Sequence, residues 1–355
     1  LLMAAIEDKP YDLAATVEQL TDLVDSHCLG PSTGHIVEAA TERRIPHIRL
    51  TDGNLVQLGH GAAQRRIWTA ETDRTSAIAE GIASDKDLTK SLLKSCGLPV
   101  PEGSLVRSPE EAWEEAQDIG LPVVVKPYDG NHGRGVSLNL MTQADVEAAY
   151  HVAARKGRSK SVIVERFVTG DEHRLLVVGK QLVAAAAAES LWVTGYGTSN
   201  IIELCNRDIN IDPRRGETED HPLGLIKPDV SAEIILELAR QGMTAQSVPL
   251  AGQKVLIQPN GNVAIDVTDD VHPSVAAAAT LAARVVGLDI AGIDMVMEDI
   301  SRPLEEQRGA IIEVNASTGL LAHLKPAVGK PRQIGTAIVG NLFGPDESGR
   351  IPIIG

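Results

Sequence analysis

The chain has 355 residues, a formal net charge of −15 at pH 7 and a sequence pI near 5.1. This length is sufficient for two or three packed lobes. The acidic charge and an aromatic content of 3% argue against a nucleic-acid-binding surface, because such surfaces gather Lys, Arg and stacking rings. No apolar run approaches the ~18 residues that a membrane-spanning helix needs. We therefore expect a globular enzyme with no nucleic-acid partner and no membrane partner.

The three cysteines, Cys28, Cys96 and Cys205, lie far apart and form no metal-binding or redox spacing. Their odd number and wide scatter favour free thiols in a reducing compartment over disulfides or a zinc site. The predicted localisation is cytoplasmic.

The first elements alternate between helix and strand. Residues 29–50 predict a loop, a helix capped by Ser32 or Thr33, and a short strand. Residues 84–97 predict a second helix, which begins at Ser84 as its N-cap and ends before a glycine.

The same alternation continues through the middle of the chain. A helix is predicted over 108–120, and a buried apolar strand follows over 121–127. Two further strands are expected over 162–168 and 174–184. Residues 206–229 are polar and rich in Asp, Arg and Pro, so they predict the longest irregular stretch.

The last third of the chain predicts an Ala-rich helix over 274–287, followed by strands over 292–298 and 310–315. Helices and strands that alternate in this way are typical of an α/β protein. The predicted fold class is therefore α/β, built as α+β lobes.

A Gly-rich turn directly after the strand at 121–127 forms the first candidate site. Lys126 lies at the strand end, and Gly133, Arg134 and Gly135 follow within ten residues. A lysine followed by glycines can hold phosphate oxygens, because backbone N–H groups come close where side chains are absent. The spacing fits neither a P-loop nor a dinucleotide-binding fingerprint, and a plain hairpin is the alternative interpretation.

The second candidate site lies on the two C-terminal strands. Asp294 interrupts an apolar strand, and Glu313 and Asn315 lie two residues apart in the next one. Side chains at i and i+2 share a face of a strand, so these three can meet from neighbouring strands. Two carboxylates and a carboxamide form an oxygen site suited to Mg²⁺ with bound phosphates. The alternative is a polar face of an edge strand.

The third candidate site spans residues 162–174. Glu165 lies near a strand end, an apolar hinge with Phe167 and Val168 follows, and Glu172 comes after a glycine. An adenine ring could lie against the hinge backbone while a carboxylate accepts hydrogen bonds from ribose hydroxyls. A solvated turn is equally compatible with this pattern.

The three clusters, in this order, resemble the ATP-grasp superfamily. Further strings resemble the ATP-grasp domain of the cyanophycin synthetase family over nearly the whole chain, namely SDKDLTK (84–90), DPRRG (212–216), AIDVTDDVHP (264–273) and IIEVNASTG (311–319). The resemblance implies the ATP-grasp fold, in which the nucleotide is held between two lobes.

The resemblance also assigns roles by position. The nucleotide-binding residues that it implies are Lys86, Lys126, Gly133, Gly135, Glu165, Phe167, Val168 and Glu172. The implied metal ligands are Asp294, Glu313 and Asn315. The implied residues of the polymer and acyl-phosphate site are Ser32, Glu80, His132 and Arg174. Taken singly, these last four have simpler interpretations, as a helix cap, a solvated helix residue, a turn residue and an ion-pair partner.

The family implies an activity and a domain arrangement. Its ATP-grasp domain uses ATP and Mg²⁺ to add L-aspartate to the C-terminal end of cyanophycin, a polymer with an aspartate backbone and arginine side branches, through an acyl phosphate. A Mur-ligase-like domain then adds arginine. We expect residues 1–27 to end an N-terminal domain, 28–346 to form the ligase domain and 347–355 to begin a linker. A polymer primer and a homo-oligomer, by resemblance a tetramer, are also implied.

Two departures from the family leave alternatives open. Residues 254–266 are shorter and less basic than usual, and 183–195 replace a more basic stretch. A dipeptide-polymerising cyanophycin synthetase, which joins β-aspartyl-arginine units, is one alternative. Another is an ATP-grasp ligase of the D-alanine or glutathione type. The last is a non-catalytic scaffold domain, although such domains usually lose a lysine or a metal ligand.

Overall fold

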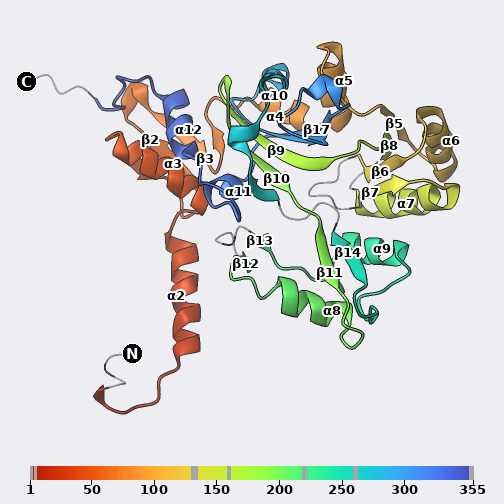
Figure 1. Cartoon of the computed structure of the whole chain (residues 1–355). Helices are drawn as coiled ribbons and strands as arrows, with labels where there is room; N and C mark the ends of the chain where they lie inside the picture. The colour runs from red at the N-terminus through yellow and green to blue at the C-terminus, as the bar shows by residue number, and fades with distance from the viewer. Residues whose placement is uncertain are drawn as a thin grey trace, which may run out of the picture. The chain divides into compact units, whose positions relative to one another are not determined.

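The computed structural model describes residues 3, 6–128, 135–157, 161–217, 221, 223–258 and 263–351 (Figure 1). The chain divides into two compact units. The first combines Leu1–Asp73 with Gly335–Gly355, and the second is Arg74–Ile334. The domain limits expected at residues 28 and 346 remain a prediction.

The described part of the first unit contains a small antiparallel sheet and several helices. Its elements are α2 (Leu13–His27), α3 (Pro31–Glu42), β1 (His47–Arg49), β2 (Leu55–Leu58), η1 (Gly61–Ala63), β3 (Arg65–Trp68), β4 (Glu71–Thr72) and α12 (Ile334–Leu342). The strand order is β1-β2-β3-β4. Arg43 closes α3 and donates to the carbonyls of Val339, Phe343 and Gly344, so it satisfies backbone acceptors at the end of α12.

The caps of two predicted helices differ from expectation. In α3 the N-cap is Gly30, and Pro31 is the first helical residue, so Ser32 and Thr33 lie inside the first turn. Proline favours this first position because its missing N–H has no intrahelical partner there. The predicted cap at Ser32 or Thr33 was therefore wrong.

The helix predicted over 84–97 is present, but it begins two residues later than expected. Ser84 ends α4 (Ala77–Ser84), and α5 (Lys86–Ser95) begins after Asp85. The Asp85 carboxylate accepts from the backbone N–H of Leu88 at 3.0 Å, so Asp85 rather than Ser84 is the N-cap.

The second unit is built around a five-stranded antiparallel sheet. In spatial order its strands are β15 (Val263–Asp266), β10 (Gln181–Ala188), β9 (Asp171–Val178), β16 (Ile290–Met297) and β17 (Ala310–Asn315). The single strand predicted over 174–184 was wrong. The chain turns at Gly179, whose φ is +62°, and returns as β10.

One face of this sheet carries the main apolar core. Helix α10 (Pro273–Val286) packs along it, and α4 and α5 lie beside α10. Leu175, Ile293 and Met295 are fully buried in this core together with Ala279 of α10. Because strand side chains alternate, Arg174 and Asp294 point to the opposite face of the sheet.

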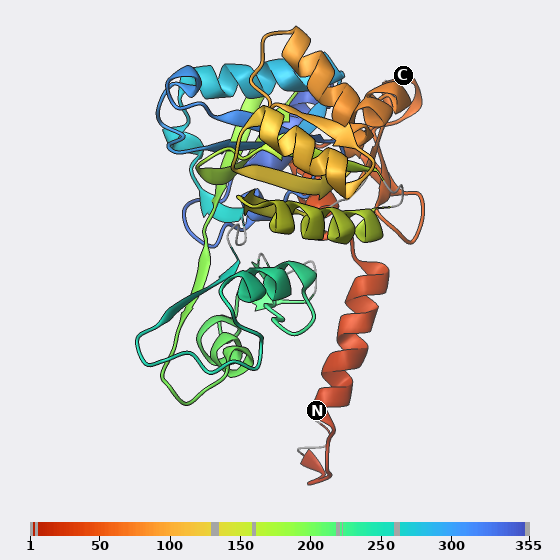
Figure 2. The same ribbon diagram turned by 90° about the vertical axis from the view of Figure 1, so that its right-hand side faces the viewer.

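A four-stranded antiparallel sheet forms a second lobe. Its order is β5 (Gly103–Val106), β8 (Val162–Arg166), β6 (Val123–Pro127) and β7 (Ser137–Leu140). Helices α6 (Pro109–Ile119) and α7 (Gln143–Lys156) pack against each other and cover one face (Figures 1 and 2). Val125 and Val164 are buried under them.

Between β10 and β15 the chain builds a third lobe with its own core. Its elements are β11 (Leu191–Thr194), α8 (Ile201–Leu204), the π-helical turn η2 (Cys205–Ile209), β12 (Arg215–Gly216), β13 (Leu223–Gly224), α9 (Ala232–Arg240) and β14 (Lys254–Gln258). Leu204, Leu238 and Ile257 are fully buried there. The stretch predicted to be irregular, 206–229, accordingly contains only short elements in its described part.

The remaining elements of the second unit are short: η3 (Thr268–Asp270), η4 (Leu304–Glu306) and α11 (Leu321–Leu324). Among the described residues, no helix combines the length and apolar character needed to cross a membrane. The alternation of helices and strands confirms the predicted α/β class.

Gly170, between β8 and β9, provides a test of backbone strain. Its φ is +130°, and a Cβ atom would lie 2.3 Å from the carbonyl carbon of Met297. We expect Gly170→Ala to lower the free energy of unfolding by about 1–3 kcal/mol, measured by chemical denaturation. The matched control is Gly81→Ala in α4, where a Cβ atom meets nothing within 4 Å. That change should raise stability by about 0.5–1 kcal/mol, and equal effects of the two changes would contradict the strain argument.

Candidate active site

A row of paired residues crosses the five-stranded sheet. Asp266 pairs with Ala186, Ala186 with Arg174, Arg174 with Asp294, and Asp294 with Glu313. Directly paired residues on neighbouring strands point to the same face. The row therefore lies on the face opposite the α10 core, and four of its five members are charged.

The centre of the row is a bidentate ion pair. The Nε atom of Arg174 donates to Oδ1 of Asp294 at 2.8 Å, and a terminal nitrogen donates to Oδ2 at 3.0 Å. The amide of Asn315 also donates to Oδ2, at 3.0 Å. Asp294 is only 4% exposed, so its charge is compensated by these contacts rather than by water. The Asp294 carboxylate in turn raises the pKa of Arg174 above its ordinary value.

The three residues predicted as metal ligands lie together. Glu313 is the cross-strand partner of Asp294, and Asn315 follows two residues later on the same face. Lys86, at the first position of α5, places its Nζ atom 3.1 Å from Oε1 of Glu313. The Glu313 end of the row is thus a site of alternating positive and negative charge.

A second charged cluster is buried in the four-stranded sheet. The Nζ atom of Lys126 lies 2.8 Å from Oε2 of Glu165, whose exposed fraction is 3%. Lys90 pairs with the other oxygen of the same carboxylate. Lys126 pairs across the sheet with Ile163, two residues before Glu165, so both side chains leave the face opposite the α6–α7 core.

Lys90 was not predicted as a site residue. It lies one turn after Lys86 on α5, and residues four apart share a helix face. This spacing was the available signal, but the residue looks like an ordinary surface lysine until the position of Glu165 is known.

Burial shifts the proton affinity of both lysines in this cluster. Burial lowers the pKa of Lys126 to about 8, and repulsion by the ammonium group of Lys86 acts in the same direction. Burial, followed by the charge of Lys126, lowers the pKa of Lys90. An anion that approached Lys126 would favour its charged form.

Other predicted nucleotide residues lie near these two clusters in the chain. Phe167 and Val168 directly follow β8 and are partly exposed. Glu172 on β9 lies two residues before Arg174, so it shares the face of the charged row. Gly135 has a φ of +76°, and a Cβ atom there would lie 2.9 Å from Cβ of Lys156.

The structure does not place every predicted residue at the site. His132 and Gly133 lie outside the described residues. Ser32 belongs to the first unit and Glu80 is an exposed residue in the first turn of α4. Their predicted roles near the polymer stay predictions.

The donor set on β16 and β17 suits a hard divalent cation. Asp294, Glu313 and Asn315 offer carboxylate and carboxamide oxygens, which Mg²⁺ prefers. Among the described residues there is no cluster of three His, Cys, Asp or Glu that could hold a metal, and the predicted set contains only two carboxylates. Arg174 and Lys86 now contact the same carboxylates, so a cation would share these oxygens with them.

Comparison with known proteins identifies the fold. A family described as "ATP-grasp domain" matches residues 79–181, which include Lys86, Lys126, Glu165 and Arg174. This chain belongs to the ATP-grasp superfamily. A crystal structure of a bifunctional glutathione synthetase from Pasteurella multocida aligns with a TM-score of 0.61 and 26% identity. That alignment covers 89% of this chain and 44% of the other, and it confirms the predicted ATP-grasp fold.

Relatives by sequence include cyanophycin synthetases. The protein from Trichormus variabilis is 40% identical over 349 residues, which are 97% of this chain and 38% of the relative. The Synechocystis protein is equally similar, with 40% of its length covered. A glutathione biosynthesis bifunctional protein from Clostridium perfringens is 32% identical over 82% of this chain and 38% of its own. The predicted resemblance to cyanophycin synthetases is confirmed, and the chain spans about two fifths of the length of these relatives.

The Arg174–Asp294 pair gives a stability prediction. Arg174→Ala leaves a buried carboxylate with only the Asn315 amide, and we expect the free energy of unfolding to fall by about 2–3 kcal/mol. The control is Arg166→Ala, which breaks an exposed pair with Glu102 (side chains 49% and 63% exposed) and should cost less than about 1 kcal/mol. Urea denaturation of the two variants compares them directly.

The same variant also tests the metal ligands. If Asp294, Glu313 and Asn315 bind Mg²⁺, added Mg²⁺ should stabilise Arg174→Ala more than the wild type, since the cation replaces the lost guanidinium. A Mg²⁺ response that is equal in the two proteins would count against these ligands.

Proposed function

We propose that this chain is an ATP-dependent carboxylate–amine ligase that extends the cyanophycin backbone. It adds L-aspartate to the C-terminal carboxylate of the polymer through an acyl phosphate and releases ADP. The single observation that carries the proposal is the charged row on the sheet. Arg174 forms an ion pair with Asp294, Asp294 is the cross-strand neighbour of Glu313, and Lys86 of α5 forms an ion pair with Glu313. Membership of the ATP-grasp superfamily and 40% identity to cyanophycin synthetases support it.

In this proposal the nucleotide phosphates lie near the lysines. Lys86 and Lys126 neutralise the phosphate oxygens, and Glu165 and Glu172 face the adenine and the ribose. Asp294, Glu313 and Asn315 would hold Mg²⁺, which would supply positive charge to neutralise the phosphate oxygens during phosphoryl transfer. The role of Lys126 is supported by its buried position and by the ease with which an anion would restore its charge.

Arg174 then stabilises the acyl phosphate. Its guanidinium is permanently charged and held in one orientation by Asp294, so little rearrangement is needed when negative charge develops nearby. We assign His132, in the Gly-rich turn, to the same site by resemblance alone.

β-Aspartyl-arginine is a second candidate for the incoming amine substrate. A dipeptide-polymerising enzyme would join whole β-aspartyl-arginine units, and the shortened connection between β14 and β15 favours it. Strand β14 ends at Gln258 and β15 begins at Val263, so only the four residues 259–262 separate them. A non-catalytic scaffold is disfavoured because the lysines and the oxygen ligands are all present. The homo-oligomeric state and the cytoplasmic localisation stay predictions.

Turnover is the direct test of this function. The chain is incubated with ATP, Mg²⁺ and a short cyanophycin primer, and L-aspartate or β-aspartyl-arginine is supplied in separate reactions. We expect primer-dependent phosphate release with one amine, and a loss of at least about 100-fold in Glu313→Ala. Glu102→Ala, a change at an exposed residue directly before β5, should retain activity. Absence of phosphate release with both amines would refute the proposal.

ATP affinity should depend on pH through Lys126. Its pKa of about 8 in the nucleotide-free chain means that the ammonium form is lost as the pH rises above 8. Because phosphate favours the charged form, the Kd for ATP should increase by up to about tenfold per pH unit between pH 8 and 9.5. Calorimetric titrations at several pH values measure this change. In Lys126→Arg the charge persists, so a flat profile is expected there and an unchanged slope would exclude Lys126 as the cause.

A further inference from the structure

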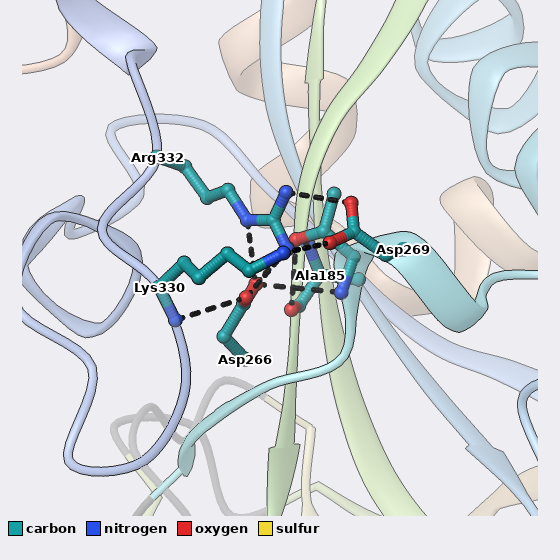
Figure 3. A network of polar contacts seen from close by, with 6 residues as sticks. Ala185, Asp266, Asp269, Lys330 and Arg332 are labelled. Carbon is teal, nitrogen blue, oxygen red and sulfur yellow. Dashed lines mark hydrogen bonds and ion pairs between the residues drawn. The ribbon is translucent and has the colours of Figure 1, made fainter.

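The edge of the five-stranded sheet at β15 carries a network of charges that is complete in itself (Figure 3). Arg332 donates its Nε atom to Oδ1 of Asp266 at 2.9 Å and a terminal nitrogen to Oδ1 of Asp269 at 2.8 Å. Lys330 lies 3.1 Å from the other oxygen of Asp269. Two cations and two anions satisfy one another here, so this network offers no surplus charge to a ligand.

The segment that follows α11 also contacts the third lobe. Val328 forms a parallel bridge with Ile265 of β15, so this segment lies beside the sheet edge. Arg214, directly before β12, donates to the carbonyl of Ala327. The third lobe therefore brings two adjacent arginines, Arg214 and Arg215, near the β15 end of the charged row.

The charges of these two arginines are balanced differently. The guanidinium of Arg214 contacts both oxygens of Asp212, at 2.9 and 2.5 Å. Arg215 donates to the carbonyl of Gly224 at 2.8 Å, and among the described residues no carboxylate forms an ion pair with it. One aspartate thus faces two arginines, and these three residues carry a net positive charge on a chain whose formal charge is −15.

Arg215 is a partly buried cation that remains accessible to a ligand. Burial lowers the pKa of Arg215, the charge of Asp212 opposes this shift, and the charge of Arg214 adds to it. A guanidinium stays protonated in proteins in spite of such a shift. Because its charge is incompletely balanced, an anion that binds beside it would offset the cost of burial. The planar fork of a guanidinium matches a carboxylate in geometry.

The separation from Arg174 fits a long substrate better than a short one. Arg174 lies on β9, and both β10 and β15 lie between it and the segment at Val328. Three strand spacings of about 4.8 Å give a lateral distance of about 14 Å. A single amino acid held at Arg174 is shorter than this distance, whereas an extended chain covers it in about four residues.

We propose that Arg215 binds a carboxylate of the polymer primer, several residues away from the end that reacts. This inference rests on the proposed ligase function and deepens it, because it gives the third lobe a part in holding the polymer. In a β-aspartyl-arginine unit the arginine is joined through its amino group, so each branch of the polymer keeps a free carboxylate. Such groups recur along the chain, and one of them therefore lies near Arg215 after every addition.

The kinetic test compares the whole chain with three variants of it. Arg215→Gln removes the charge, Arg215→Lys keeps it, and Lys227→Gln is the control, because Lys227 forms an exposed ion pair in the same lobe (side chains 52% and 64% exposed). We expect Arg215→Gln to raise the KM for the primer about tenfold, since a charge-assisted hydrogen bond is lost, while the KM values for ATP and for the amine change less than twofold. Arg215→Lys should fall between Arg215→Gln and the wild type, and Lys227→Gln should behave like the wild type. An unchanged KM for the primer in Arg215→Gln, or a rise in the KM for the amine instead, overturns the inference.

A modified primer separates carboxylate binding from a structural role of Arg215. A primer whose branch carboxylates are converted to amides lacks the proposed ligand. Calorimetry should show that the wild type binds it about tenfold more weakly than the native primer, and that Arg215→Gln binds the two primers equally. The comparison in the wild type does not depend on the folding of any variant. Equal weakening in both proteins would assign the carboxylates to other residues and overturn the inference.

Turnover of the wild type with ATP, Mg²⁺ and the native primer is measured in parallel. Its absence with both candidate amines would overturn the ligase function on which the inference rests. Turnover with equal KM values for the native and the amidated primer would overturn only the role of Arg215.

Discussion

The ion pair between Arg174 and Asp294 is the contact on which the rest of the site depends. A carboxylate that is 4% exposed in the middle of a sheet needs a compensating cation, and the adjacent strand supplies one in bidentate geometry. Because Arg174 is fixed by Asp294, and Asp294 by Asn315, three strands present their polar groups in one arrangement. The apolar residues between them in sequence build the core on the opposite face.

This division of one sheet into an apolar and a charged face also explains how each lobe presents charged side chains to the candidate site. Helix α10 covers the apolar face of the five-stranded sheet and stabilises it by packing. The other face is therefore available for charged side chains. The four-stranded sheet repeats the arrangement on a smaller scale. Its α6–α7 face is apolar, and its other face carries Lys126 and Glu165. Helix α5 brings Lys86 to one charged face and Lys90 to the other.

Much of this arrangement could be predicted from the sequence, because strand alternation is a strong signal. Glu313 and Asn315 share a face by their spacing alone, and Asp294 stands out within an apolar strand. Arg174 was identified only through the family resemblance, since nothing local distinguishes it from a surface arginine. The turn at Gly179 was missed because the residues on both sides of it are equally apolar.

The helix caps and Lys90 show a different limit. Ser84 and Asp85 both suit an N-cap, and only the meeting of α4 with α5 decides between them. Lys90 contacts a residue far away in the chain, Glu165. A lone lysine in a helix carries no local signal of such a contact.

Two lysine amines share the single carboxylate of Glu165, and this has a consequence for the turnover cycle. If Lys126 turns toward a nucleotide, Lys90 keeps its contact with Glu165, so the buried carboxylate retains a hydrogen-bond donor. If the nucleotide departs, Lys126 regains a partner that is already in place. The energy difference between the loaded and the empty cleft is thereby reduced. A catalyst that must discharge ADP after every added residue benefits from such a resting position for its phosphate-binding lysine.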